Sequence, residues 1–113
     1  MMMRSRNSNV RVTKELTVLN QHGLHARPAS EFVRCAIAFE SELYIETQGK
    51  RFHAKRIIDV LLANLNCGST FTLEAIGHDA NEAVARFEKL LLQFKEADDQ
   101  TANHTAPAEK IPD

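Results

Sequence analysis

The sequence is poor in the residue types that mark several classes of protein. Its 113 residues include no tryptophan, one tyrosine and two cysteines, so the core must come from Phe, Leu, Ile, Val and Ala. No apolar run approaches the roughly 18–20 residues that a membrane span needs. The N-terminal segment MMMRSRNSN carries charge but no apolar stretch, unlike a secretory signal. We therefore expect a small cytoplasmic protein that does not insert into a membrane.

Charge, cysteine and histidine patterns exclude further classes. Fourteen basic and fifteen acidic side chains nearly cancel, which argues against a generally basic nucleic-acid-binding protein. Cys35 and Cys67 form no CxxC pair, and none of the five histidines belongs to an HxxxH pair. We expect reduced thiols rather than a disulfide, no metal site and no cofactor.

The two ends of the chain differ from its middle. Residues 1–11 are mostly polar, and residues 96–113 are rich in Ala, Asp, Thr and Pro without apolar periodicity. This composition predicts two flexible tails around a single domain that covers residues 12–95.

Within this domain, apolar periodicity predicts strands and helices in the order β-α-β-β-α-β-α. Strands are predicted over residues 13–19, 42–47, 51–53 and 70–77. Helices are predicted to begin near Ala26, to span residues 56–65 and to run from Ala80 to Lys95. Gln48-Gly49 is typical of a hairpin turn, and Asp79 with Glu82 is typical of a capping box. The order predicts an α+β fold in which helices cover one face of a four-stranded sheet.

The helix predicted over residues 56–65 carries apolar residues over more of its circumference than one buried stripe needs. Two interpretations stay open: part of the helix is an exposed partner surface, or the helix is enclosed on several sides. The residues concerned are Ile57, Ile58, Val60, Leu61, Leu62 and Leu65.

The segment GLHARPA, residues 23–29, carries the chemical signal of the sequence. Pro28 suits the first turn of a helix, where its missing N–H has no intrahelical role. His25 then lies at or just before the N-cap, a position at which histidine is a poor choice for stability alone. Gly23 supplies backbone freedom for the preceding turn.

Such a helix start can bind a phosphate-sized anion. Unpaired first-turn N–H groups, here those of Ala26 and Arg27, combine with the helix dipole and the Arg27 guanidinium. The same positive field favours a neutral His25 imidazole, which can act as a nucleophile toward phosphorus. The alternative is that His25 lies at the helix end without a functional role and that Arg27 is a solvated surface charge. The ordered combination of Gly23, His25, Arg27 and Pro28 favours the functional interpretation.

GLHARPA resembles the active-site signature of the HPr family, the histidine-containing phosphocarriers of the bacterial phosphoenolpyruvate-dependent phosphotransferase system. The resemblance extends over residues 13–95 and includes the Gly49 hairpin, the Ala54-Lys55 pair and the Gly68 turn. It implies an open-faced β-sandwich with four antiparallel strands in the order 1-4-2-3 and three helices on one face. It also implies a stoichiometric carrier, expected to be a monomer, rather than an enzyme with its own turnover.

The resemblance assigns roles to residues at matching positions. His25 matches the histidine that enzyme I phosphorylates on Nδ1 and that passes the phosphoryl group to IIA components of sugar permeases. Arg27 matches the arginine beside the phosphate. The implied docking surface consists of Ile57, Ile58 and Leu61, with positive charge added by Arg34, Lys55 and Arg56.

This sequence departs from the family pattern at Arg56. Many members begin the short helix with a serine that a dedicated kinase phosphorylates, and an arginine there implies that this switch is absent. His22 is a second peculiarity: it either contacts the phosphate region or is an exposed loop residue. Three functions stay open, namely a sugar-branch carrier, a regulator of the nitrogen-related branch, and a non-catalytic binding module that acts through the short helix.

Overall fold

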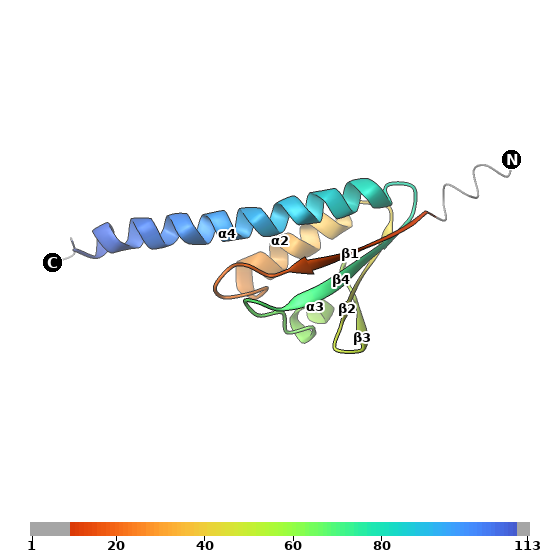
Figure 1. The fold of residues 1–113 in the computed structure, drawn as a ribbon, viewed down its shortest axis with the longest axis horizontal. Coiled ribbons are helices and arrows are strands. Elements are labelled where there is room, and N and C mark those ends of the chain that lie inside the picture. Colours follow the sequence, from red (N-terminus) through yellow and green to blue (C-terminus); the bar gives the residue numbers. More distant parts are fainter. Residues whose placement is uncertain (1–9, 111–113) are drawn as a thin grey trace, which may run out of the picture.

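The computed structural model describes residues 10–110, with side chains up to Asp99 (Figure 1). Four strands and three helices follow one another in the predicted order. They are β1 (Arg11–Thr17), α2 (Ala26–Ile37), β2 (Glu42–Thr47), β3 (Lys50–His53), α3 (Ile57–Leu62), β4 (Thr70–Ile76) and α4 (Ala80–Lys110).

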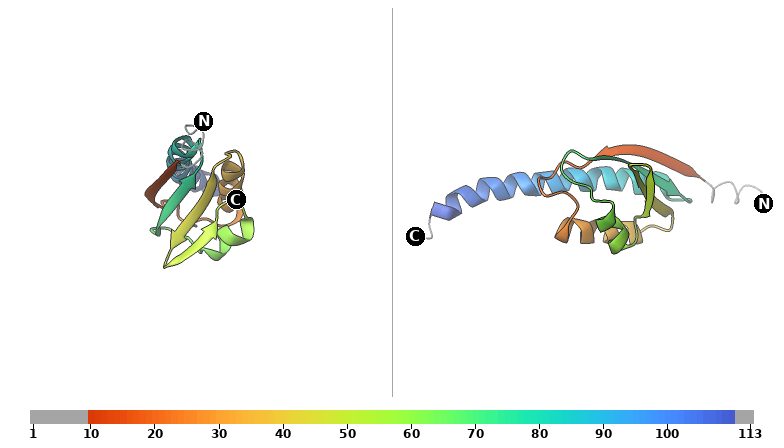
Figure 2. Two further views of the ribbon diagram at one scale, coloured as in Figure 1. Left: turned by 90° about the vertical axis from the view of Figure 1, so that its right-hand side faces the viewer. Right: turned by 90° about the horizontal axis from the view of Figure 1, so that it is seen from below.

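The strands form one antiparallel sheet in the order β1-β4-β2-β3. The helices cover one of its faces and leave the other open (Figure 2). This arrangement confirms the predicted α+β open-faced sandwich. The β2–β3 hairpin turns at Gln48 and Gly49, as predicted, and both residues have positive φ angles, 53° and 75°. Two consecutive residues of this kind give a turn whose twist matches the flanking strands.

The core lies between the sheet and the helices and centres on three phenylalanines. The ring centroid of Phe32 in α2 lies 4.6 Å from that of Phe87 in α4 and 6.3 Å from that of Phe71 in β4. Leu73 and Ile45 are fully buried beside them. Packing of α2 against this cluster fixes the direction of the helix and therefore the place of its N-terminus.

Helix α4 corrects the predicted end of the last helix. Apolar periodicity predicts an end at Lys95, but the helix continues to Lys110 (Figure 1). Extending an existing helix needs no new nucleation, so alanine-rich sequence can continue it without an apolar face. Lys95 supports the extension through a 2.9 Å ion pair with Asp99, one turn further along. Residues 1–9 and 111–113, which belong to the predicted tails, lie outside the described part of the chain.

Three other local predictions differ from the structure. Strand β1 covers Arg11–Thr17 rather than residues 13–19, and Val18 instead bonds through its backbone to Gly68 and Ser69 in the turn before β4. Helix α3 ends at Leu62 rather than at residue 65, because Asn64 has a positive φ of 52° that a helix cannot continue. The predicted capping box at Asp79 is not formed among the described residues. Its carboxylate instead accepts hydrogen bonds from the backbone N–H groups of Glu40 and Ser41, each at 2.9 Å, and from the Ser41 hydroxyl. Asp79 thus ties the chain after α2 to the start of α4.

Candidate functional site

The loop between β1 and α2 is fixed by a close backbone contact at Gly23. A Cβ atom on Gly23, whose φ is 72°, would stand 2.4 Å from the carbonyl oxygen of Leu65. The backbone N–H of Leu24 donates to that same oxygen at 2.8 Å. Only glycine fits this approach, so the loop that precedes His25 lies directly on the segment that follows α3.

Asn20 closes the same loop from inside. Its buried amide Nδ2 donates to the carbonyl oxygen of Gly23 at 2.8 Å, and the N–H of Gly23 donates back to the carbonyl oxygen of Asn20 at 3.2 Å. These bonds and the contact with Leu65 determine where the chain enters α2.

His25 is the N-cap residue of α2, as the sequence predicts, with φ −130° and ψ 162°. Its side chain makes no capping hydrogen bond to the helix, so the imidazole is available for other chemistry. Ala26, the first helical residue, has a φ of 53°. A non-glycine residue in this region is strained by about 1–3 kcal/mol, and such strain concentrates at functional sites.

The imidazole of His25 makes one hydrogen bond among the described residues. Its Nε2 atom lies 3.1 Å from Oδ1 of Asn66, in the segment between α3 and β4. The sequence does not indicate a role for Asn66, because this residue follows His25 by 41 positions and belongs to no motif. Only the fold brings the two side chains together.

His25 opens onto a hollow of about 400 Å³ at the N-terminus of α2. Arg27 is exposed at its rim, and the first turn of α2 contains no acidic residue that would oppose the helix dipole. His22 is exposed and also lines the hollow. The lining consists of Asn20, His22, His25, Ala26, Arg27, Pro28, Glu31, Phe94, Ala97 and Asp98.

One wall of this hollow comes from the unpredicted part of α4. Asp98 Oδ2 accepts a 2.6 Å hydrogen bond from the backbone N–H of Gln21. The extension of α4 past Lys95 therefore touches the loop that carries His22 and His25. Composition predicts a tail over residues 96–113, so it indicates neither this wall of the hollow nor the contact of Asp98 with Gln21.

Comparison with known proteins identifies the family of this chain. Residues 12–93 match the family model described as "PTS HPr component phosphorylation site". The chain belongs to the HPr family. It is 42% identical over 73 residues to the HPr-like protein Crh of Halalkalibacterium halodurans, which covers 65% of this chain and 87% of Crh. It is 37% identical over 82 residues to phosphocarrier protein HPr of Lysinibacillus sphaericus, covering 73% and 93% of the two chains.

Other similar proteins include an HPr of known structure and a much longer protein, DhaM, of which this chain matches a small part. The crystal structure of HPr from Bacillus anthracis superimposes with a TM-score of 0.70 at 35% identity, covering 73% of this chain and 98% of that one. The chain is also 37% identical over 75 residues to DhaM of Pantoea ananatis, the phosphoryl donor subunit of a dihydroxyacetone kinase. That match covers 66% of this chain but only 16% of DhaM.

The structure decides between the two interpretations of the short HPr helix α3. Val60 is fully buried and anchors the helix, whereas Ile58 is 62% exposed and Leu62 is 66% exposed. Ile57 and Leu61 are also exposed, at 39% and 38%. An apolar surface therefore faces solvent on α3, and the enclosed alternative is wrong.

The three basic residues predicted for the docking surface differ in their surroundings. Arg34 and Arg56 are exposed. Lys55 is partly buried, and its Nζ atom donates to the carbonyl oxygen of Phe39 at 2.8 Å. Lys55 thus ties the start of α3 to the segment that follows α2, a structural role that the sequence did not indicate.

Arg56 is the N-cap residue of α3 and makes no side-chain capping bond. Asp59 supports this end of the helix instead, because its Oδ2 accepts a hydrogen bond from the backbone N–H of His53 at 2.9 Å. The helix start is therefore secured without a serine at position 56.

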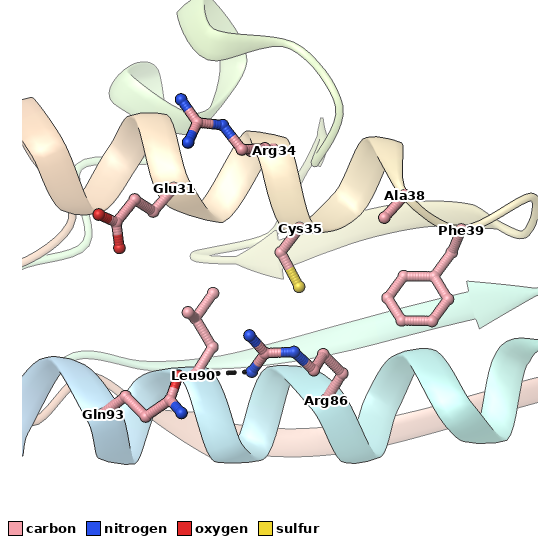
Figure 3. Close-up of a pocket in the computed structure, with 8 residues that line it drawn as sticks. All are labelled: Glu31, Arg34, Cys35, Ala38, Phe39, Arg86, Leu90 and Gln93. Atoms are coloured by element: carbon pink, nitrogen blue, oxygen red, sulfur yellow. Dashed lines mark hydrogen bonds between the residues drawn. The ribbon is translucent and has the colours of Figure 1, made fainter.

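A second hollow, of about 390 Å³, lies between α2 and α4 (Figure 3). Arg86 points into it and lies 3.5 Å from Gln93, whereas Arg34 points out toward α3. Because the two guanidinium groups do not converge, this hollow lacks the paired charges of a phosphate cradle. Burial raises the pKa of the Cys35 thiol on its wall, which keeps that thiol in the unreactive protonated form.

Three further observations concern the described residues as a set. They contain no group of three or more His, Cys, Asp or Glu side chains that could hold a metal ion. Among them, no helix combines the length and the apolar character that crossing a membrane requires. Cys35 and Cys67 are both free thiols.

Proposed function

We propose that this protein is a phosphocarrier that accepts a phosphoryl group on Nδ1 of His25 from phosphorylated enzyme I and donates it to IIA components of sugar permeases. The observation that carries the proposal is the position of His25. Its imidazole stands at the N-cap of α2 without a capping role, beside Arg27 and the first-turn N–H groups.

The transfer exchanges one P–N bond for another. The electron pair on Nδ1 of His25 attacks phosphorus, the P–N bond to the donor histidine breaks, and the electron pair of that bond returns to the donor ring. The phosphoryl oxygens then lie near the N–H groups of Ala26 and Arg27 and near the Arg27 guanidinium. Phosphoryl transfer depends mainly on position and on neutralised charge, which this small site supplies without a metal or cofactor.

Both partners dock on the apolar surface of α3. Ile57, Ile58 and Leu61 are exposed on α3, and Arg34 and Arg56 add positive charge that would steer acidic partners. Because Arg56 cannot be phosphorylated by a serine kinase, this surface keeps a constant charge. The carrier works in the cytoplasm, where phosphoenolpyruvate is available.

The carrier role is tested by labelling with radioactive phosphoenolpyruvate and enzyme I. We expect an acid-labile label on the native protein and on His22→Ala, which removes a neighbouring histidine of the same hollow, but none on His25→Ala. An unlabelled native protein beside an active control HPr would refute the proposal.

The acceptor is tested by offering the labelled protein a panel of partners. Transfer to sugar-type IIA proteins is expected, and preferential transfer to nitrogen-type IIA proteins would move the protein to the regulatory branch. The similarity to DhaM adds dihydroxyacetone kinase components to the panel.

A non-catalytic binding module is the alternative of a different class. It predicts that Ile58→Asp abolishes partner binding while His25→Ala leaves the biological output intact. The carrier predicts that both substitutions stop phosphoryl flow. We also expect this protein to be a monomer. Sedimentation tests this prediction, which matters because similar structures include dimers of Crh and of HPr from Thermoanaerobacter tengcongensis.

A further inference from the structure

Asn66 is placed to decide which ring nitrogen of His25 carries the proton. Asn66 Oδ1 lies 3.1 Å from His25 Nε2. An amide oxygen only accepts hydrogen bonds, so the nitrogen that faces it must donate. The proton of the neutral ring therefore stays on Nε2, and Nδ1 keeps its free electron pair.

The position of Asn66 is set by the backbone on both sides of it. Its N–H donates to Ser69 Oγ at 3.1 Å, and the N–H of Ser69 donates back to its carbonyl oxygen at 2.9 Å. Gly23 packs so closely that an added Cβ would stand 2.8 Å from the Cα atom of Asn66. The packing of these two loops therefore fixes the backbone positions from which the side chains of His25 and Asn66 meet.

We propose that Asn66 is a positioning residue that holds His25 in its Nε2–H tautomer and so makes Nδ1 the nitrogen that receives the phosphoryl group. This assignment rests on the proposed carrier function. A free imidazole samples both tautomers, and only the one with an unprotonated Nδ1 can react there. Asn66 raises the fraction of molecules that are ready to react.

The same contact also favours the phosphorylated state. When Nδ1 forms the new P–N bond, the ring keeps its Nε2 proton and gains positive charge. The hydrogen bond to Asn66 Oδ1 then becomes charge-assisted, and such bonds are stronger than neutral ones. Asn66 therefore stabilises phosphorylated His25 more than unphosphorylated His25.

The direct test is ¹⁵N NMR of the His25 ring at alkaline pH, where the imidazole is neutral. The native protein is expected to show the Nε2–H tautomer. Asn66→Ala should shift the tautomer ratio about fivefold toward Nδ1–H, the effect of losing one ordinary hydrogen bond. Asn66→Asp keeps an acceptor and should preserve the native tautomer. Cys67→Ala, at the exposed neighbouring position, should change nothing.

The rate of phosphorylation gives the second measurement. With enzyme I and phosphoenolpyruvate, Asn66→Ala should be phosphorylated several-fold more slowly than native protein or Cys67→Ala. A native Nδ1–H tautomer, or an unchanged ratio in Asn66→Ala, would overturn the role of Asn66 even if His25 is phosphorylated. If the tautomers behave as expected and no phosphoryl group is accepted, the carrier function fails and the tautomer control by Asn66 stands.

Discussion

The carboxylate of Asp98 holds the backbone N–H of Gln21, with 2.6 Å between Oδ2 and the amide nitrogen. Asp98 lies beyond residues 12–93, the part of the chain that matches the HPr family model. The extended helix α4 thus supports the loop before His25 in a way that a chain ending with the family match could not. Asp98 of the α4 extension also lines the hollow onto which His25 opens.

This contact predicts slower hydrogen exchange at one backbone amide. Asp98→Ala should increase the exchange rate of the Gln21 amide about fivefold, because one hydrogen bond of ordinary strength is lost. Asp99→Ala is the matched control, since Asp99 pairs with Lys95 at 2.9 Å rather than with the loop. Equal exchange rates in native protein and Asp98→Ala would show that the contact does not hold the loop in solution.

The positive φ of Ala26 predicts that Ala26→Gly stabilises the fold. Glycine removes the steric penalty of the left-handed conformation but increases the entropy of the unfolded chain. The net effect should be a gain of about 0.5–1 kcal/mol in the free energy of unfolding, measured in urea. Ala85→Gly, at an exposed interior position of α4, should instead cost about 1 kcal/mol. A loss of stability in both variants would mean that Ala26 is not strained.

The surroundings of Glu74 predict that substitutions of two arginines have non-additive effects on the free energy of unfolding. Glu74 of β4 is 3% exposed, and its carboxylate is paired with Arg11 of β1 and with Arg51 of β3. Either half-exposed guanidinium can neutralise it, so each single change to alanine should cost about 1 kcal/mol or less. The double change leaves a buried carboxylate without a partner and should cost about 3 kcal/mol. A double-mutant cycle that is additive would contradict this shared role.

The ion pair between His78 and Glu40 predicts that the stability of the fold depends on pH. Their Nε2 and Oε1 atoms are 2.6 Å apart, and this hydrogen bond raises the pKa of His78 above its ordinary value of 6.5. A folded-state pKa above the unfolded value stabilises the fold below pH 6.5. That contribution is lost as the pH rises through the folded-state pKa.

An NMR titration of His78 measures this directly. Glu40→Gln should bring the pKa of His78 back toward 6.5. Glu82→Gln should lower this pKa less, because Glu82 acts only through its charge, which has a smaller effect on His78 than the hydrogen bond to Glu40. If Glu40→Gln leaves the pKa unchanged, the ion pair is not formed in solution.

The sequence predicted what depends on local pattern. Apolar periodicity located every strand and helix, and GLHARPA located the start of α2 and His25 at its N-cap. The strand order was predicted from the family resemblance. These features are local, or belong to a fold whose signature is short and specific.

What the sequence did not predict depends on contacts between distant segments. Asn66 reaches His25 only because Gly23 and Leu24 pack on the residue before it. Asp98 reaches Gln21 only because α4 continues without an apolar stripe. No local periodicity encodes such contacts, and composition alone suggested a tail where the helix continues.

The most direct test of the account is NMR of the ¹⁵N-labelled protein after incubation with enzyme I and phosphoenolpyruvate. We expect a single phosphoramidate with phosphorus coupled to Nδ1 of His25, and the Nε2 proton still present and bonded to Asn66. A protein that takes up no phosphoryl group, or takes it up on His22 or on Nε2 of His25, would contradict the account.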